Sequence, residues 1–269
     1  MDFVDCGCWD VLQLAMKLDP ILLDTACRYS KKAYDDHIPD SIKIESKLTS
    51  TTVFIIKRRT IDIVCFRGTQ SLHDWLFNLS AVPVPYARRL CHGGFVAAHL
   101  SVWGKIKKHL HPKKRTLFCG HSLGGALAEL SVAKLTGKHP NLNLVAFGKP
   151  NTFFKGFKRP MELDNQISCV RGSDLVATIP RFFYGPSKSQ TMLYFANSGK
   201  DYIDPAKAFR KKDRKGAGAM SNHLMRGYTV RLDAFLGHQV EAKNIAATII
   251  EEETKELNKL LDEVEDANG

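Results

Sequence analysis

Short apolar runs alternate along the chain with stretches in which apolar residues recur every three or four positions. β-branched apolar runs at 52–57 and 61–66, with a short basic turn between them, predict a hairpin. Two more apolar runs, at 116–119 and 142–147, flank a helical stretch from about 124 to 136. This is the pattern of a β-α-β unit, whose crossover helix packs on a parallel sheet. The pattern therefore predicts an α/β domain with a mostly parallel central sheet.

Weaker signals place the remaining elements around this unit. Asp19-Pro20 supplies an N-cap and a proline at the first helical position, and helical spacing continues from there until Ile38-Pro39. A second helix is expected at 95–110, a buried strand at 167–170, and a hairpin from 190–196 and 201–203. Residues 207–215, which hold six basic residues, are expected to form a mobile loop.

The end of the chain differs in composition from the rest. From about Leu236 it is predicted to be helical, and apolar residues there follow the alternating spacing of a coiled coil. Residues 238–269 hold nine acidic residues and three lysines. We therefore predict an α/β domain at 1–237 and an acidic amphipathic helix at 238–269. That helix either packs on the body or mediates self-association or binding of a partner helix.

The net charge of +11 is concentrated before the acidic tail, so the body of the chain is strongly cationic. Such a body favours an anionic partner, and phospholipid headgroups and nucleic acid are the two obvious classes. No basic segment is interleaved with aromatic residues and no nucleic-acid motif is present, so we expect no nucleic-acid partner. Peripheral contact with an anionic membrane, through the basic residues of 207–215, is the remaining expectation, and the alternative is a solvated basic loop with no membrane role.

Cysteine usage and the start of the chain indicate the compartment. The seven cysteines are scattered, odd in number and fall mostly on apolar segments, which is typical of reduced thiols. Cys6-x-Cys8 has no second cluster at metal-binding spacing, so we expect no metal. No run reaches the roughly eighteen apolar residues of a membrane span, and the acidic start lacks the features of a signal peptide. These features predict a cytoplasmic protein that is not secreted by a standard signal.

Gly120-His121-Ser122-Leu123-Gly124 matches G-x-S-x-G and lies between a predicted strand and a predicted helix. Strand, sharp turn and helix form a nucleophile elbow, in which the serine takes strained backbone angles. Small residues two positions before and after the serine avoid clashes there, and Gly120 and Gly124 occupy these positions. The helix N-terminus adds positive potential, and the Leu123 amide is a candidate oxyanion donor. The alternative is a glycine-rich helix entry capped by Ser122.

A serine nucleophile needs a histidine that accepts its proton and a carboxylate that fixes the tautomer of that histidine. In the chain order Ser, Asp/Glu, His, three histidines follow Ser122, namely His139, His223 and His238. Asp174 comes just after a predicted buried strand and is the candidate acid, which excludes His139. His223 is favoured because it lies in a loop, whereas His238 is placed at a helix start. The fallback acids, more typical of turns, are Asp164, Asp201 and Asp204.

These residues, taken in order, resemble the class 3 lipases, the fungal triacylglycerol lipase-like branch of the α/β-hydrolase superfamily. The resemblance covers about residues 29–228. Its motifs are Cys65-Phe66-Arg67-Gly68-Thr69, Asp74-Trp75, His92-Gly93-Gly94-Phe95, Gly120 to Leu127, Phe147-Gly148-Lys149-Pro150, Asp174 and Ile179-Pro180. The chain departs from the family in the loop Gly148-Lys149-Pro150-Asn151-Thr152-Phe153 and at Asn78, which leaves the specificity open. The loop that carries His223 lacks the disulfide cysteines of secreted members, which agrees with a reduced compartment.

The resemblance implies an α/β-hydrolase fold with helices on both faces of the sheet. It implies a serine carboxylic-ester hydrolase that forms an acyl-enzyme, with Ser122, Asp174 and His223 as catalytic residues and the amides of Thr69 and Leu123 as the oxyanion hole. It also implies a lid at about 71–79, whose apolar stripe is formed by Leu72, Trp75, Leu76 and Leu79. The alternative for this stripe is plain core packing.

The expected substrates are acyl lipids, as for a glycerolipid lipase or a phospholipase, and no cofactor is needed. The alternative is a catalytically silent lipase-like module that binds other proteins.

Overall fold

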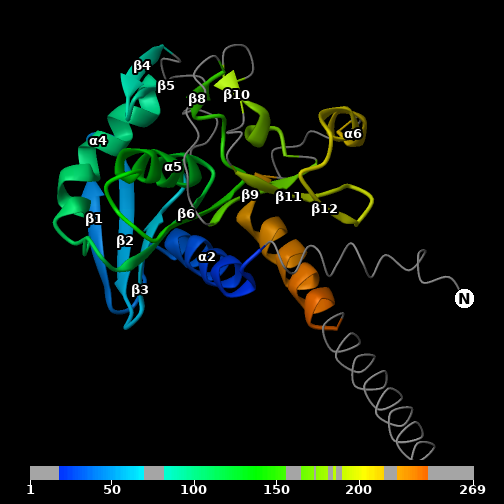
Figure 1. Ribbon diagram of the computed structural model, residues 1–269, viewed down its shortest axis with the longest axis horizontal. Helices are drawn as coiled ribbons and strands as arrows, with labels where there is room; N and C mark the ends of the chain where they lie inside the picture. Colours follow the sequence, from blue (N-terminus) through cyan, green and yellow to red (C-terminus); the bar gives the residue numbers. More distant parts are fainter. Residues whose placement is uncertain are drawn as a thin grey trace, which may run out of the picture. The chain divides into compact units, whose positions relative to one another are not determined.

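The computed structural model describes residues 18–69, 82–155, 165–172, 174–180, 184–185, 190–214 and 223–241 (Figure 1). The chain divides into two compact units, Ile21–Leu232 and a smaller unit of Met1–Pro20 with Asp233–Gly269. The domain boundary that the sequence predicts between residues 237 and 238 stays a prediction.

The larger unit is built on an eight-stranded sheet with the order β1-β2-β3-β6-β7-β9-β11-β12. The five strands from β3 to β11 run parallel to one another, and β1, β2 and β12 pair antiparallel. This confirms the mostly parallel sheet and both predicted hairpins. The strands are β1 (Ser41–Ser46), β2 (Thr51–Lys57), β3 (Ile61–Phe66), β6 (Arg115–His121), β7 (Leu142–Phe147), β9 (Asn165–Arg171), β11 (Thr191–Phe195) and β12 (Asp201–Ile203).

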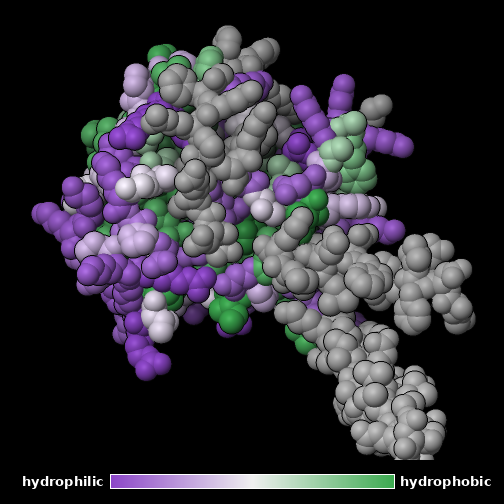
Figure 2. Space-filling view, viewed as in Figure 1, coloured by the Kyte–Doolittle hydropathy of each residue, from purple (hydrophilic) through white to green (hydrophobic). Residues whose placement is uncertain are grey.

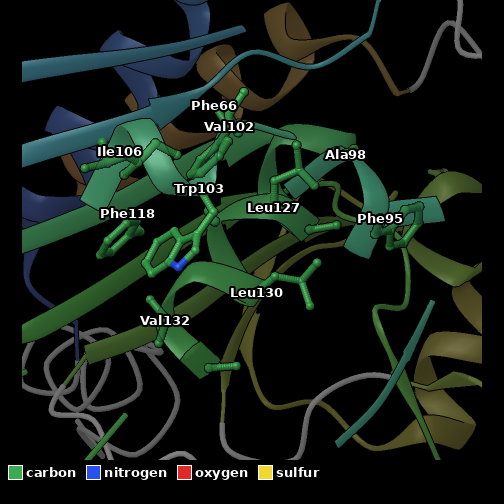
Figure 3. Close-up of a cluster of buried hydrophobic side chains, with 14 of the residues drawn as sticks. Phe66, Phe95, Ala98, Val102, Trp103, Ile106, Phe118, Leu127, Leu130 and Val132 are labelled. Atoms are coloured by element: carbon green, nitrogen blue, oxygen red, sulfur yellow. The ribbon is translucent and has the colours of Figure 1, made fainter. Parts of the chain in front are cut away.

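Helices cover both faces of this sheet, as expected. On one face, α4 (Gly93–Lys107) and α5 (Leu123–Leu135) pack on alternate residues of the central strands. Figure 3 shows the resulting core, in which Phe66 and Phe118 from the sheet meet Val102 and Leu127 from the helices. On the opposite face lie α2 (Pro20–Lys32) and helical residues 225–232. Helix α5 connects the parallel neighbours β6 and β7, which confirms the β-α-β unit.

A second sheet of four short strands was not predicted from the sequence. Its order is β10-β8-β5-β4, and all of its pairings are antiparallel. Strands of two to four residues are too short to show an alternating pattern, which explains why the prediction failed. The strands are β4 (Pro83–Tyr86), β5 (Arg89–His92), β8 (Phe153–Phe154) and β10 (Tyr184–Gly185).

The mobile loop predicted at 207–215 is wrong for the residues that the structure describes, because Lys207–Asp213 form the helix α6. Two residues of this helix that are not basic anchor it to its neighbours. Phe209 packs against the rings of Tyr194 and Tyr202. The carboxylate of Asp213 accepts hydrogen bonds from the Tyr194 hydroxyl, at 2.9 Å, and from a backbone amide of the β11–β12 turn.

Several expectations lie outside the described residues. These are the lid at 71–79 with Leu72, Trp75, Leu76 and Leu79, the coiled-coil stripe of the tail, Cys6-x-Cys8 and the fallback acid Asp164. Among the helices that the structure does describe, none is both long enough and apolar enough to cross a bilayer.

Candidate active site

Ser122 lies at the sharp turn between the end of β6 and the start of α5, as the nucleophile elbow requires. Its backbone angles are φ 57° and ψ −131°, a conformation that costs an L-residue about 1–3 kcal/mol. Hydrogen bonds on both sides hold the turn. The Ser122 amide donates to the carbonyl of Phe147 on β7 at 2.9 Å, and the Gly125 amide donates to the Ser122 carbonyl at 3.0 Å.

The two glycines that flank the serine allow this turn to approach its neighbours. A Cβ atom on Gly120 would lie 2.5 Å from the carbonyl carbon of Gly124, and one on Gly124 would lie 2.2 Å from the backbone oxygen of Phe66. Real Cβ atoms do not come so close to the backbone. The structure therefore explains both glycines of the motif by sterics, and the alternative of a simple helix cap leaves them unexplained.

His223 and Asp174 are brought together from positions that are distant in the sequence. The Nδ1 atom of His223 lies 2.7 Å from Oδ2 of Asp174, and both residues are buried. Because the carboxylate accepts, Nδ1 carries the proton, and Nε2 of the neutral ring is then an acceptor. This is the tautomer that a general base toward a serine hydroxyl requires.

Asp174 follows β9 and starts the turn into the 3-10 helix η2 (Val176–Thr178). Its Oδ1 atom accepts from the backbone amides of Val176, at 2.8 Å, and Ala177, at 3.4 Å. Its Oδ2 atom accepts from the hydroxyl of Tyr228 at 2.6 Å as well as from His223. Burial and the adjacent carboxylate raise the pKa of Tyr228 well above its usual value, so its hydroxyl stays a donor. Sequence reasoning missed Tyr228.

The reactive atoms are buried at the carboxyl ends of the parallel strands. Within the described residues, neither Oγ of Ser122 nor Nε2 of His223 has a hydrogen-bond partner. The ring of His121, the residue before the serine, lies with its centroid 4.5 Å from that of His223. The nucleophile, the base and the acid of the sequence prediction thus lie on the side of the sheet where the parallel strands end.

The two predicted oxyanion donors lie on adjacent segments. Leu123 is the first residue of α5, directly after the elbow. Thr69 lies just beyond β3, and Phe66 at the end of β3 is the register partner of Gly120. The segment 67–69 therefore continues beside the elbow. Leu123 thus directly follows Ser122, and Thr69 follows Gly68, whose Cβ position lies 2.9 Å from the backbone oxygen of His121. The role of both residues in binding an oxyanion stays a prediction.

The other histidines after Ser122 lie elsewhere. His139 follows α5, and its ring nitrogens contact the carbonyls of Pro140 and His111. His238 lies within the helical residues 225–241 rather than at a helix start, so the sequence prediction of its position was wrong. Two fallback acids have turn or edge roles, as expected: Asp201 forms an ion pair with Arg231, and Asp204 accepts from the Met192 amide at 2.7 Å.

A buried ion pair lies beside the elbow, at one of the positions where the chain departs from the family pattern. Nζ of Lys149, in the segment after β7, is 3.0 Å from Oε2 of Glu129 on α5, and both side chains are buried. Gln190 donates to the other oxygen of Glu129 at 2.6 Å. A Cβ atom on Gly125 would lie 2.9 Å from Cβ of Lys149, so this lysine packs directly on the start of α5.

Among the residues whose placement the structure describes, no group of three or more His, Cys, Asp or Glu is arranged to hold a metal ion.

The chain is similar in sequence to known lipases. Residues 63–184 match the family model described as Lipase (class 3). The chain is similar to secreted mono- and diacylglycerol lipase 1 of Fusarium solani, with 25% identity over 191 residues, which are 64% of this chain and 53% of that protein. The chain therefore spans about half the length of this curated relative.

Solved structures show the same fold. One is the triacylglyceride lipase of Rhizomucor miehei, with a TM-score of 0.61, 18% identity, and coverage of 79% of this chain and 93% of that chain. Another is a triacylglycerol lipase described as having a serine protease triad at its catalytic centre, with a TM-score of 0.59, 18% identity, and coverage of 75% and 91%. These similarities confirm the α/β-hydrolase fold.

Proposed function

Because residues 63–184 belong to the class 3 lipase family of the α/β-hydrolase superfamily, we propose that this chain is a serine hydrolase of carboxylic esters in acyl lipids. Ser122 is the nucleophile, His223 is the general base and then the general acid, and Asp174 orients His223.

One observation supports this assignment above all others. His223 donates from Nδ1 to a fully buried carboxylate, and its opposite nitrogen and the Ser122 hydroxyl are both buried with no partner among the described residues. Leaving two buried polar atoms without partners costs free energy, about 1–3 kcal/mol each. Such a cost is typical of catalytic groups that find their partners in the reacting complex.

The reaction follows from these positions. Ser122 Oγ attacks the ester carbonyl carbon while Nε2 of His223 takes the hydroxyl proton, and the carbonyl oxygen becomes an oxyanion that faces the amides of Thr69 and Leu123. The intermediate then collapses, and His223 gives its proton to the departing alcohol. Water next attacks the acyl-enzyme with His223 again as base, and the fatty acid leaves as Ser122 regains its proton.

We propose glycerolipids as the substrate class, as for a glycerolipid lipase. The alternative is that the enzyme is a phospholipase. The Fusarium solani relative is named for mono- and diacylglycerols, and the Rhizomucor miehei structure is named for triacylglycerides. The cationic body of the chain favours lipids at an anionic surface, which a phospholipase or a lipase at a membrane would meet.

We propose that α6 contributes to contact with such a surface. Lys207, Lys211 and Lys212 of this helix are exposed, and Figure 2 shows hydrophilic side chains gathered where α6 lies. Each lysine near an anionic membrane contributes about 1 kcal/mol to binding. Replacing the three by glutamine should weaken binding to phosphatidylglycerol vesicles and spare hydrolysis of soluble esters. The matched control replaces the exposed Lys107, Lys108 and Lys138 in the same way, and equal losses in both triple variants would contradict a specific role of α6.

A reducing, cytoplasmic location remains part of the proposal, as does self-association through the acidic tail. Five cysteines, namely Cys27, Cys65, Cys91, Cys119 and Cys169, are free and buried, which is compatible with reduced thiols.

A catalytically silent module that binds other proteins is the alternative function. A fluorophosphonate probe separates the two, since it labels only an activated serine. We expect labelling of the wild type and of Ser198→Ala, which changes an exposed turn serine, and none of Ser122→Ala. A lipid panel read by mass spectrometry of released fatty acids then identifies the substrate. If the wild type neither reacts with the probe nor hydrolyses short-chain esters, the silent module is the correct reading.

A further inference from the structure

His121 precedes the nucleophile, and both nitrogens of its buried ring are engaged. Nε2 lies 2.6 Å from the backbone carbonyl oxygen of His223, and Nδ1 lies 2.6 Å from the hydroxyl of Tyr34. Tyr34 belongs to the 3-10 helix η1 (Ala33–Asp35), which follows α2. A residue next to the nucleophile therefore contacts the backbone of the candidate general base, 102 positions further along the chain.

The direction of these two hydrogen bonds is fixed by chemistry. A carbonyl oxygen only accepts, so Nε2 of His121 carries the proton. Burial lowers the pKa of His121 to about 3, so the ring is neutral and Nδ1 must accept. Tyr34 is then the donor, and burial raises the pKa of its hydroxyl above the usual value, so that the donor persists in alkaline solution. One tautomer of His121 satisfies both partners.

Tyr34 also contacts the segment that leads to the predicted oxyanion donor Thr69. A Cβ atom on Gly68 would lie 2.1 Å from the Tyr34 hydroxyl oxygen and 2.9 Å from the backbone oxygen of His121. Only a glycine leaves room for the hydroxyl at this place. The Tyr34 hydroxyl thus lies where the strand ends of β3 and β6 meet the loop of His223.

We propose that His121 and Tyr34 are positioning residues of the catalytic machinery: His121 holds the backbone of His223, and Tyr34 fixes His121 in the tautomer that can do so. This inference rests on the proposed function, in which His223 must point Nε2 at Ser122. Neutrality of His121 serves the same end. The His223 ring becomes cationic as it takes the serine proton, and a second cation with its ring centroid 4.5 Å away would oppose that charge.

The chain contains a matched control for this arrangement. His99, buried between α4 and α5, receives the hydroxyl of Tyr86 at Nδ1 at 2.9 Å, and its Nε2 contacts the Ser131 hydroxyl at 2.9 Å. Tyr86→Phe therefore removes the same kind of tyrosine–histidine hydrogen bond from a place that touches none of the three catalytic candidates. Its effect should be confined to stability.

The test compares Tyr34→Phe with Tyr86→Phe in hydrolysis of a soluble p-nitrophenyl ester and in the rate of reaction with a fluorophosphonate. For Tyr34→Phe we expect kcat and the probe rate to fall between about tenfold and a hundredfold, the loss typical of a misplaced catalytic group, with KM little changed. His121→Gln keeps an N–H donor and should retain more activity than His121→Leu. Equal kcat values for wild type, Tyr34→Phe and His121→Leu would overturn the positioning role.

Histidine ¹⁵N NMR of the wild type provides a readout that does not depend on activity. We expect the His121 ring to show the neutral form protonated at Nε2 down to about pH 4, and we expect Tyr34→Phe to change the signals of both His121 and His223. A His121 ring protonated at Nδ1, or titrating near neutral pH, would overturn the inference. Failure of the wild type to react with the probe would instead overturn the proposed function, whatever the tautomer.

Discussion

Asp174→Asn tests the catalytic assignment because it replaces one oxygen of a carboxylate whose two oxygens both accept hydrogen bonds. Oδ1 accepts two backbone amides, and Oδ2 accepts His223 and Tyr228. An asparagine has only one oxygen, and it will keep the backbone amides because these can only donate. The amide NH₂ group then faces His223 and donates to Nδ1. The ring proton is forced to Nε2, where it prevents His223 from accepting the proton of Ser122.

The expected loss in kcat is about 10⁴-fold, the effect of the wrong tautomer in a serine triad, which corresponds to about 5.5 kcal/mol of transition-state stabilisation. KM for a soluble ester should change little, because Asp174 is buried behind His223. The assay is steady-state hydrolysis of a p-nitrophenyl ester, with folding checked by thermal unfolding. Asp201→Asn, at an edge strand, is the control and should keep near-normal kcat. A D174N enzyme that retains more than about a tenth of wild-type kcat refutes this reasoning.

Three further predictions concern the structure around the site. Gly124→Ala places a Cβ against the backbone of β3, so it should lower the free energy of unfolding by about 1–3 kcal/mol and also lower kcat. The control is Gly104→Ala, which has open space around it and should be neutral or stabilising when both variants are unfolded with denaturant. Lys149→Met leaves the carboxylate of Glu129 buried without its cation and should cost about 3–5 kcal/mol by urea unfolding, and adding Glu129→Leu should restore much of this; a double variant as unstable as the single one contradicts it. Burial lowers the pKa of His99 to about 3, below the unfolded value near 6.5, so its contribution is complete above pH 6.5 and declines by about 1.4 kcal/mol per pH unit as the pH falls toward 3. His99→Gln should therefore show a shallower loss of stability between pH 7 and 4, and an unchanged slope would argue against a neutral buried ring.

The residues of the candidate triad could be predicted because their signals are local or follow from chain order. Ser122 was identified by glycines that a sharp turn requires, and Asp174 by its place directly after a buried strand. His223 was chosen by elimination, and its contact with Asp174 is consistent with that choice. The structure adds that His238 lies inside a helix, so its position at a helix start, one of the reasons given against it, was wrong.

The groups that hold the triad could not be predicted in the same way. Tyr228 is 54 positions from Asp174, and Tyr34 is 87 positions from His121. Nothing in the local sequence around either tyrosine distinguishes it from a tyrosine that is merely half-buried at a helix surface. Such a contact depends on which strand ends and helix faces meet, and that is decided by the whole sheet order.

The same distinction explains the errors in the fold. The parallel strands were predicted because they are buried on both faces and form continuous apolar runs. Strand β1 pairs at the sheet edge and buries only one of its six residues, Ile44, so its sequence lacks that signal. Helix α6 was mistaken for a loop because its basic residues dominate the composition, while Phe209 and Asp213, which anchor it, interact with residues of β11 and the following turn.

The nucleophile elbow and His223 are therefore held in place in two different ways. Two backbone hydrogen bonds keep Ser122 in its strained conformation. Close contacts with neighbouring backbone leave room only for glycine two positions before and two positions after it. The position of His223 is held by His121, which contacts its backbone carbonyl, and by Asp174, which contacts its ring; Tyr228 in turn donates to Asp174. A substitution at the glycines should thus disturb folding and catalysis together. A substitution that removes the hydroxyl of Tyr34 or Tyr228 should cost only about 1–3 kcal/mol of folding free energy, for the buried acceptor left unpaired, and should lower kcat as well, because proton transfer depends steeply on geometry.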